Sequence, residues 1–246
     1  MDQQIQNSDF SNYSLDRGDI QSVSKTFIAN VFMWMFGALT ISTVFAFLFS
    51  QNLTLLSYLV GPTGLSPLGY FVMFAPIGFV LLMSFGYQRL SSPLMAFLFL
   101  TYAAINGISF SFILLAYTAS SVFSCFASAA VMFGIMAVMG YTTNKDLTSF
   151  GRILIMGLIG ILVAFIINFF LKSSGLNYLI SIIGVAVFTG LTAYDVQKLK
   201  RIAEGTQFEG VGAESVKKTS IMGALTLYLD FINLFLMILR LFGRRR

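Results

Sequence analysis

The chain has 246 residues, of which 57% are hydrophobic and 10% are charged, whereas soluble proteins carry about 25% charged residues. A soluble fold of this length could not bury so much apolar surface, so the composition excludes a soluble enzyme or binding domain and indicates a membrane protein. The absence of histidine removes the commonest metal ligand, the single cysteine excludes an intrachain disulfide, and the net charge of +5 forms no basic face of the kind that binds nucleic acid.

The first 26 residues are polar and partly acidic, and they lack the basic start and short apolar core of a secretory signal peptide. We therefore predict an uncleaved polar tail over residues 1–26, a transmembrane domain over 27–242 and a basic tail over 243–246. Asp19 and Ser22 or Ser24 are candidates for capping the first helix.

Seven apolar segments of about 20 residues follow, and each is long enough to cross the hydrocarbon core of a bilayer as a helix. They cover residues 27–50, 69–88, 93–117, 120–141, 151–171, 177–198 and 220–242. The segments are too long and too uniformly apolar for the strands of a transmembrane barrel. The sequence thus predicts an all-α polytopic membrane protein whose longest internal link spans residues 199–219.

Small residues recur inside these segments at a spacing of four. The pairs Gly107/Ser111, Gly160/Ala164 and Ala186/Gly190 predict positions where helix backbones approach closely. Cys125 lies in an apolar run and is interpreted as a small residue that faces lipid or another helix.

The distribution of Lys and Arg predicts the topology. With seven spans, ten of the 15 basic residues lie on the side of the N-terminal tail, which favours a cytoplasmic N-terminus. The basic residues 244–246 oppose this assignment, and a re-entrant last segment would move them to the other side. The side of the C-terminus therefore stays open at this stage.

Two carboxyl groups, Asp195 and Asp230, lie inside the apolar segments. An Asp at the centre of a transmembrane helix costs about 2.5–3.5 kcal/mol, so each is a functional-site candidate. Asp230 lies near the middle of the last segment, on the same helical face as Thr226 and Asn233. Asp195 lies near the end of the sixth segment, where a simple interfacial pair with Lys198 is the alternative.

If the two helices are neighbours, the two carboxyl groups would share one proton, because both cannot be ionised cheaply in a low-dielectric site. Deprotonation would add a repulsion that pushes the helices apart. The same oxygens suit a hard cation such as Ca²⁺, with Asn233, Thr192 and Tyr228 as further ligands or hydrogen-bond partners. Arg89, at the end of the second segment, is either a latch that bridges to Asp195 or a cytoplasmic topology anchor.

Residues 188–200, which read FTGLTAYDVQKLK, resemble the sixth-helix signature of the Bax inhibitor-1 family, also called the transmembrane Bax inhibitor motif family. Residues 223–236, which read GALTLYLDFINLFL, resemble that family's last helix, and the compact chain is similar to bacterial inner-membrane members.

The resemblance implies a bundle of seven helices with the last one at the centre, surrounded by the other six. It also implies a pH-sensitive Ca²⁺ leak with a pair of aspartates as sensor, which correspond here to Asp195 and Asp230. The family's second helix can supply an acid as well, but residues 70–88 contain none, and Arg89 matches the family's arginine only loosely.

Two other functions are compatible with the residues. A non-conducting regulator would bind other membrane proteins through its helices or through residues 199–219. An intramembrane aspartyl protease is disfavoured, because residues 227–230 read Leu-Tyr-Leu-Asp rather than Gly-x-Gly-Asp and no proline follows Pro93. We therefore expect no enzymatic activity and no resident cofactor, with lipid, protons and Ca²⁺ as partners and no nucleic acid.

Overall fold

The computed structural model describes residues 17–61, 64–208 and 212–246, and this part of the chain contains eight helices and one short hairpin. The hairpin pairs β1 (Val60–Gly61) with β2 (Gly64–Leu65). The helices are α1 (Arg17–Gln51), α2 (Leu53–Leu59), α3 (Pro67–Gly86), α4 (Ser92–Ala116), α5 (Ala119–Thr142), α6 (Thr148–Leu171), α7 (Ser174–Phe208) and α8 (Ala213–Phe242). All except α2 are long and apolar enough to cross a membrane, which confirms the predicted all-α polytopic fold with seven spans.

Three helices extend beyond the predicted apolar segments, because hydropathy marks the edge of the lipid and not the end of a helix. The predicted link over residues 199–219 is mostly helical, since α7 continues to Phe208 and α8 begins at Ala213. Its Lys, Arg and Glu residues are good helix formers. Similarly, the described part of α1 begins at Arg17, so Asp19, Ser22 and Ser24, the candidates for its cap, lie within the helix. Residues 1–16 of the predicted tail lie outside the described residues.

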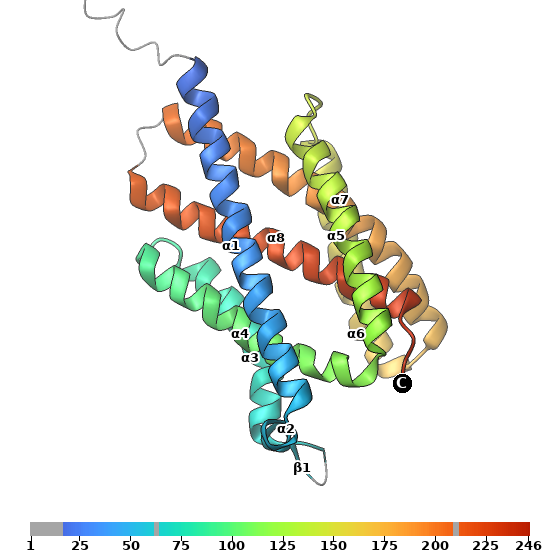
Figure 1. Cartoon of the computed structure of the whole chain (residues 1–246). Helices are drawn as coiled ribbons and strands as arrows, with labels where there is room; N and C mark the ends of the chain where they lie inside the picture. The colour runs from blue at the N-terminus through green and yellow to red at the C-terminus, as the bar shows by residue number, and fades with distance from the viewer. Residues whose placement is uncertain (1–16, 62–63, 209–211) are drawn as a thin grey trace, which may run out of the picture.

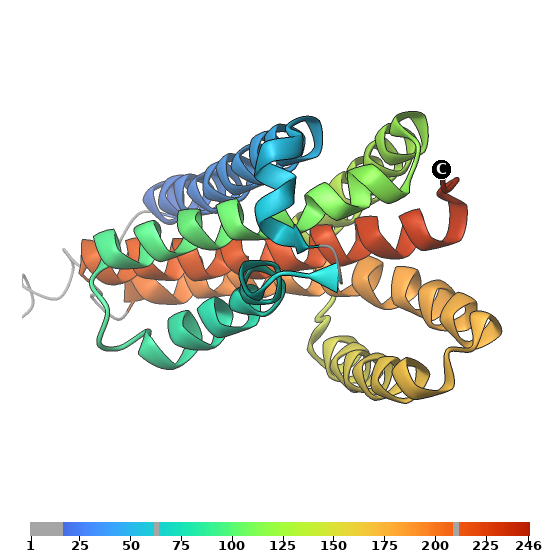
Figure 2. The same cartoon turned by 90° about the horizontal axis from the view of Figure 1, so that it is seen from below.

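Helix α8 lies at the centre of the bundle, as expected (Figure 1). It packs against α1, α4, α5 and α7, and 72% of its apolar span is buried, the largest share among the seven spans. The other six helices contact α8 to different extents. Helix α3 packs mainly on α4, and α6 packs on α7 with only 11% of its span buried, so both lie in an outer layer (Figure 2).

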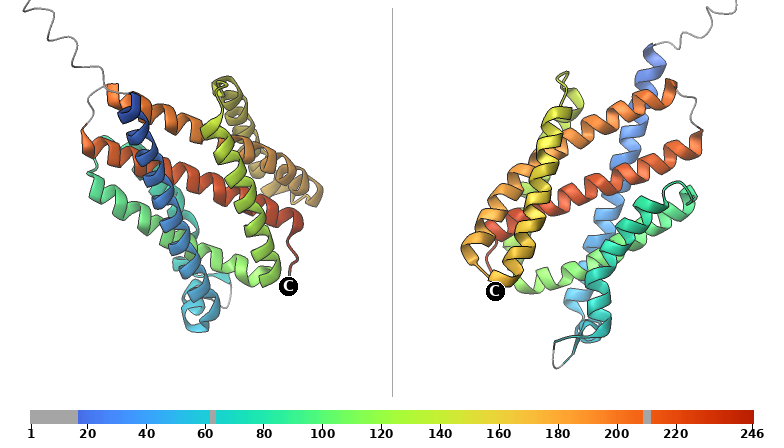
Figure 3. Two further views of the ribbon diagram at one scale, coloured as in Figure 1. Left: turned by 45° about the horizontal axis from the view of Figure 1, so that its top comes forward. Right: turned by 180° about the vertical axis from the view of Figure 1, so that it is seen from behind.

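The two ends of the bundle differ in charge. The start of α1 and the α3–α4, α5–α6 and α7–α8 connections lie at one end, which we call the basic end because ten of the 15 Lys and Arg residues lie there (Figures 1 and 3). Helix α8 is continuous, so the last segment is not re-entrant. Residues 243–246 lie at the opposite end, where Thr118 N donates to Arg244 O over 3.0 Å and Arg246 N donates to Ala116 O over 3.0 Å.

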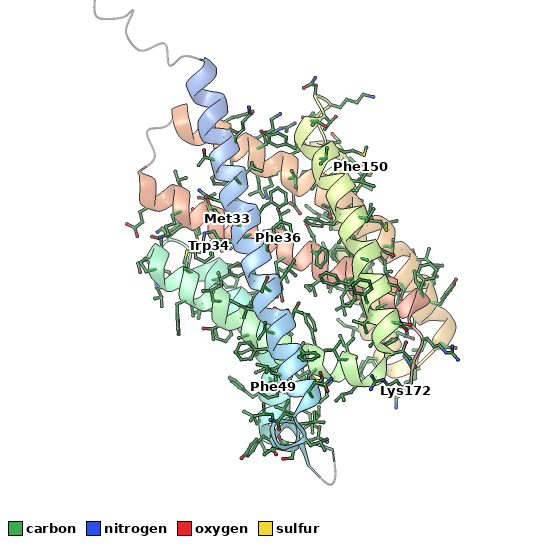
Figure 4. All side chains as sticks on the ribbon, viewed as in Figure 1. Met33, Trp34, Phe36, Phe49, Phe150 and Lys172 are labelled. Atoms are coloured by element: carbon green, nitrogen blue, oxygen red, sulfur yellow. The ribbon has the colours of Figure 1, made fainter. Side chains whose placement is uncertain are left out.

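The outer face of the bundle is apolar, as a lipid-facing surface must be. On α1, Met33 is 67% exposed and Phe36 is 59% exposed, and both point away from the other helices (Figure 4). On the opposite face of α1, Val31 and Met35 are fully buried. The helices are therefore apolar all round, which is the arrangement of a membrane span.

Only some of the predicted small-residue pairs lie at helix contacts. A Cβ atom on Gly107 would overlap the backbone of Ser42 on α1, and one on Gly190 would meet Leu154 on α6. Gly160 has nothing within 4 Å and faces outward, so the packing interpretation is wrong there. The spacing of small residues does not specify which side of a helix faces a neighbour. Gly140, which the pattern missed, lies against the Ala193 backbone on α7.

At the basic end, Asp146 holds the turn between α5 and α6. Its Oδ1 atom accepts hydrogen bonds from Thr148 N and from Arg201 Nη2, both over 2.8 Å. Hydrogen bonds from the Thr148 side chain and backbone, and then from Arg201, lower the pKa of Asp146 from its ordinary 3.8 to about 2. A carboxyl group with a lowered folded-state pKa stabilises the fold above its unfolded pKa, and this contribution is lost as the pH falls through the folded value.

We therefore expect Asp146→Asn to lower the melting temperature slightly near neutral pH. The wild-type advantage should shrink as the pH falls below about 4 and be lost as the pH falls through about 2. The effect is small because the ion pair is exposed. Thermal unfolding of both proteins in detergent across this range measures it, and a constant difference at every pH would contradict the assignment.

Candidate functional site

The candidate site is the pair of carboxyl groups that α7 and α8 bring together. The carboxyl groups of Asp195 and Asp230 lie within hydrogen-bonding reach of each other. Asp230 is only 6% exposed, and Asp195 is half-buried. The Oδ2 atom of Asp230 is buried and accepts no hydrogen bond from an N–H or hydroxyl donor in the described part of the chain.

The register of the two antiparallel helices explains this meeting. Gly184 on α7 lies against Met237 on α8, and further along the pair Leu199 lies against Gly223. These two contacts flank the carboxyl groups on either side along the helices. Because the small residues allow the backbones to approach, the side chains between them meet in the interface of α7 and α8.

Two threonines and one asparagine that were predicted for the site lie on the same helices as the two carboxyl groups. Thr192 is fully buried and donates to Phe188 O over 2.8 Å, and Thr226 donates to Met222 O over 3.1 Å. Both protons are therefore used within their own helices, although the oxygen lone pairs stay available. Asn233 is half-buried, one turn beyond Asp230 on α8.

Tyr228 belongs to a separate polar cluster between α1, α4 and α8. Its hydroxyl group lies 2.7 Å from Ser42 Oγ and accepts a hydrogen bond from Asn106 Nδ2 over 3.1 Å. Its ring makes edge contacts with Tyr102 and Phe99, at centroid distances of 5.5 and 6.2 Å. Two residues along a helix correspond to a rotation of about 200°, so the Tyr228 and Asp230 side chains point to opposite sides of α8.

Sequence reasoning missed Ser42 and Asn106 in this cluster. The sequence marks each of them only as a neutral polar residue in an otherwise apolar span. Such residues often form hydrogen bonds only within their own helix, so this signal is weak. In this protein the Ser42 hydroxyl also lies 2.7 Å from Ala103 O on α4, so the cluster joins three helices.

We expect Tyr228→Phe to lower the free energy of unfolding by about 1–3 kcal/mol, because it leaves the buried Ser42 hydroxyl and the half-buried Asn106 amide without their shared partner. Reversible unfolding in mixed detergent micelles measures the difference. Tyr178→Phe is the matched control, since Tyr178 is 59% exposed. Equal losses for the two variants would show that the cluster contributes nothing.

Arg89 is exposed in the turn that follows α3, where its backbone N donates to Gly86 O over 2.9 Å. Among the described residues, the ion pair is that of Arg201 with Asp146, so neither Arg89 nor Lys198 forms one with Asp195. This geometry favours the topology anchor over the latch. Lys198 interacts with Asp195 electrostatically, without a direct ion pair.

Cys125 is buried and faces Ile238 on α8, as the helix-facing interpretation predicts. Within residues 17–61, 64–208 and 212–246, no group of three or more His, Cys, Asp or Glu side chains could hold a metal ion. The carboxyl pair therefore offers a proton site and two ligands for a cation, with any further ligands coming from neutral oxygens.

Comparison with known proteins identifies relatives along most of the chain. The family described as inhibitor of apoptosis-promoting Bax1 matches residues 24–246. The inner membrane protein YbhL of Escherichia coli K12 is 44% identical over 222 residues, which cover 90% of this chain and 93% of that protein.

An uncharacterized protein of Borreliella burgdorferi is 41% identical over 225 residues, which cover 91% of this chain and 94% of that protein. A further relative is an uncharacterized membrane protein of Streptococcus pyogenes serotype M3. The latter is 38% identical over 160 residues, which cover 65% of this chain and 67% of that protein. Seven spans and this relationship to an inner membrane protein make the chain a multi-pass protein of the bacterial inner membrane. The names of these relatives state no catalytic activity.

Proposed function

This chain belongs to the Bax inhibitor-1 family of membrane proteins, and on that premise we propose that it is a pH-sensitive Ca²⁺ leak channel gated by Asp195 and Asp230. The observation that carries the proposal is the contact between two carboxyl groups from different helices inside the bundle. Intramembrane carboxyl groups are expensive to retain, which favours a functional role over a structural one.

In the proposed closed state, one proton is shared between the two carboxyl groups, and the resulting hydrogen bond holds α7 against α8. Loss of that proton leaves two negative charges in the same interface. Two unit charges about 4 Å apart repel by about 4 kcal/mol at an effective dielectric constant of about 20. This repulsion would change the ratio of closed to open states by about a thousandfold, which is enough for a gate. The sign follows: raising the pH opens the channel.

Ca²⁺ is the cation proposed to pass, because it prefers carboxylate and carbonyl oxygens and takes 6–8 of them. The ionised pair would supply carboxylate oxygens from two helices, and Asn233, Thr226 and Thr192 are the neutral oxygens on the same helices. A site with only two charged ligands favours passage of the ion over tight retention. Ca²⁺ is therefore cargo in this proposal and not a resident cofactor.

Reconstitution of the full chain into liposomes that contain a Ca²⁺ indicator tests the proposal. We expect Ca²⁺ entry above that of protein-free liposomes, and we expect the rate to rise as the pH on both sides is raised from about 5 to about 8. Parallel measurements with K⁺ and Na⁺ test selectivity. A rate equal to that of protein-free liposomes at every pH would reject conduction, and a rate that falls with rising pH would reject the proposed gate.

A further inference from the structure

A cavity of about 300 Å³ opens at the basic end, away from the two aspartates. Three helices that are distant in sequence line it: Ser24 and Lys25 on α1, Tyr141 and Thr142 at the end of α5, and Lys200 on α7. These lining residues carry two ammonium groups and no carboxyl group, so the charge of the cavity suits an anion.

Lys200 is fixed at the wall of this cavity. Its Nζ atom donates to Tyr141 O over 3.1 Å and lies 5.3 Å from the centre of the Tyr141 ring. An ammonium group has three donors, so these contacts leave Lys200 able to donate to a ligand. Lys25 is exposed on α1, and neither lysine forms an ion pair with a described acidic residue, although Glu204 lies one turn from Lys200.

Ser24 supplies an independent observation. Its side chain is 4% exposed, and its Oγ atom is buried without a hydrogen-bond partner among the described residues. Buried hydroxyl groups nearly always have a partner. A hydroxyl group without a partner in the lining of a two-lysine cavity is the arrangement expected of a site whose ligand supplies the missing acceptor.

The position of the cavity limits the classes of anion that can reach it. The positive-inside rule assigns the basic end to the cytoplasm, where phosphate groups occur both on anionic lipids at the membrane surface and on soluble metabolites. The cavity lies where the membrane-spanning helix α5 ends, which is where a span of this length is expected to reach the lipid headgroups. Exposed apolar side chains such as Val138 and Met139 continue along α5 from there.

We propose that this cavity is a phosphate-binding site, formed by Lys25, Lys200 and Ser24, that holds the headgroup of an anionic phospholipid. The phosphate oxygens accept hydrogen bonds from the two ammonium groups and from the Ser24 hydroxyl, while the acyl chains lie along the apolar surface of the neighbouring helices. Such a lipid contacts α1, α5 and α7 together at the basic end of the bundle. This site does not depend on conduction or on the aspartate pair.

Native mass spectrometry of the full-length protein, titrated with phosphatidylglycerol or phosphatidylcholine, tests the proposal. We expect one phosphatidylglycerol molecule to bind more tightly than phosphatidylcholine. The double variant Lys25→Gln/Lys200→Gln should weaken this binding by about 30-fold, as expected for two lysines at an anionic interface. Lys145→Gln/Arg152→Gln removes two exposed charges from the same end but outside the cavity, and it should change the affinity by less than about twofold.

Ser24→Ala should keep the fold, because the hydroxyl group it removes has no hydrogen-bond partner among the described residues, and it should weaken binding several-fold. Titration with inorganic phosphate and glycerol 3-phosphate separates the two sources of the phosphate group. If neither compound displaces phosphatidylglycerol, the site holds a lipid, as proposed. If either compound displaces it and Lys25→Gln/Lys200→Gln abolishes that effect, the site binds a soluble phosphate and the lipid assignment is overturned. Equal loss of affinity in the two double variants, or no preference for phosphatidylglycerol, would overturn the proposal.

Discussion

Asp230→Asn is expected to abolish the pH dependence of Ca²⁺ flux and to reduce the flux at pH 8 by at least about tenfold. Asparagine has almost the same shape and keeps a hydrogen bond to Asp195, but it cannot carry the negative charge that the proposed gate requires. The helices α7 and α8 therefore stay together at every pH. Asp195→Asn should give the same result, and the double variant should be no worse than either single one, because the two groups act as one unit.

Asp146→Asn is the matched control for this experiment. It makes the same chemical change at the surface of the basic end, where Asp146 pairs with Arg201. Flux and its pH dependence should be those of the wild type. A normal pH response in Asp230→Asn would remove the aspartates from gating, and comparable losses in all three variants would point to a general effect of surface or net charge.

Gly140→Leu is expected to prevent stable folding, with a loss of at least about 3 kcal/mol. A Cβ atom at this position would overlap the carbonyl oxygen of Ala193 on α7. A backbone atom cannot rotate away as a side chain can, so α5 and α7 would have to separate. Since Ala193 lies two residues before Asp195, even a partly folded variant would have a disturbed aspartate pair.

Gly134→Leu makes the same substitution on the same helix and provides the control. Gly134 has nothing within 4 Å and is exposed on the outer face of α5. We expect wild-type yield of folded protein for this variant and loss of the monodisperse peak in size-exclusion chromatography for Gly140→Leu. Equal behaviour of the two variants would mean that the close contact at Gly140 does not limit packing.

The sequence by itself determined the membrane class, the seven spans and the identity of the two intramembrane carboxyl groups. These are local properties: about 20 apolar residues are enough to define a span, and a charge within such a run is visible without knowledge of its neighbours. The motifs around Asp195 and Asp230 likewise pointed to the family that the comparisons then established.

Only the tertiary structure decided which of these residues meet. It brought Asp195 to Asp230, turned Tyr228 toward Ser42 and Asn106, left Gly160 facing outward, and placed α3 and α6 in the outer layer. In a soluble protein, the polar face of each helix would have predicted much of this. Here lipid and core are equally apolar, so hydrophobic periodicity carries little information on which side of a helix is buried, and only the packing of the helices against each other decides it.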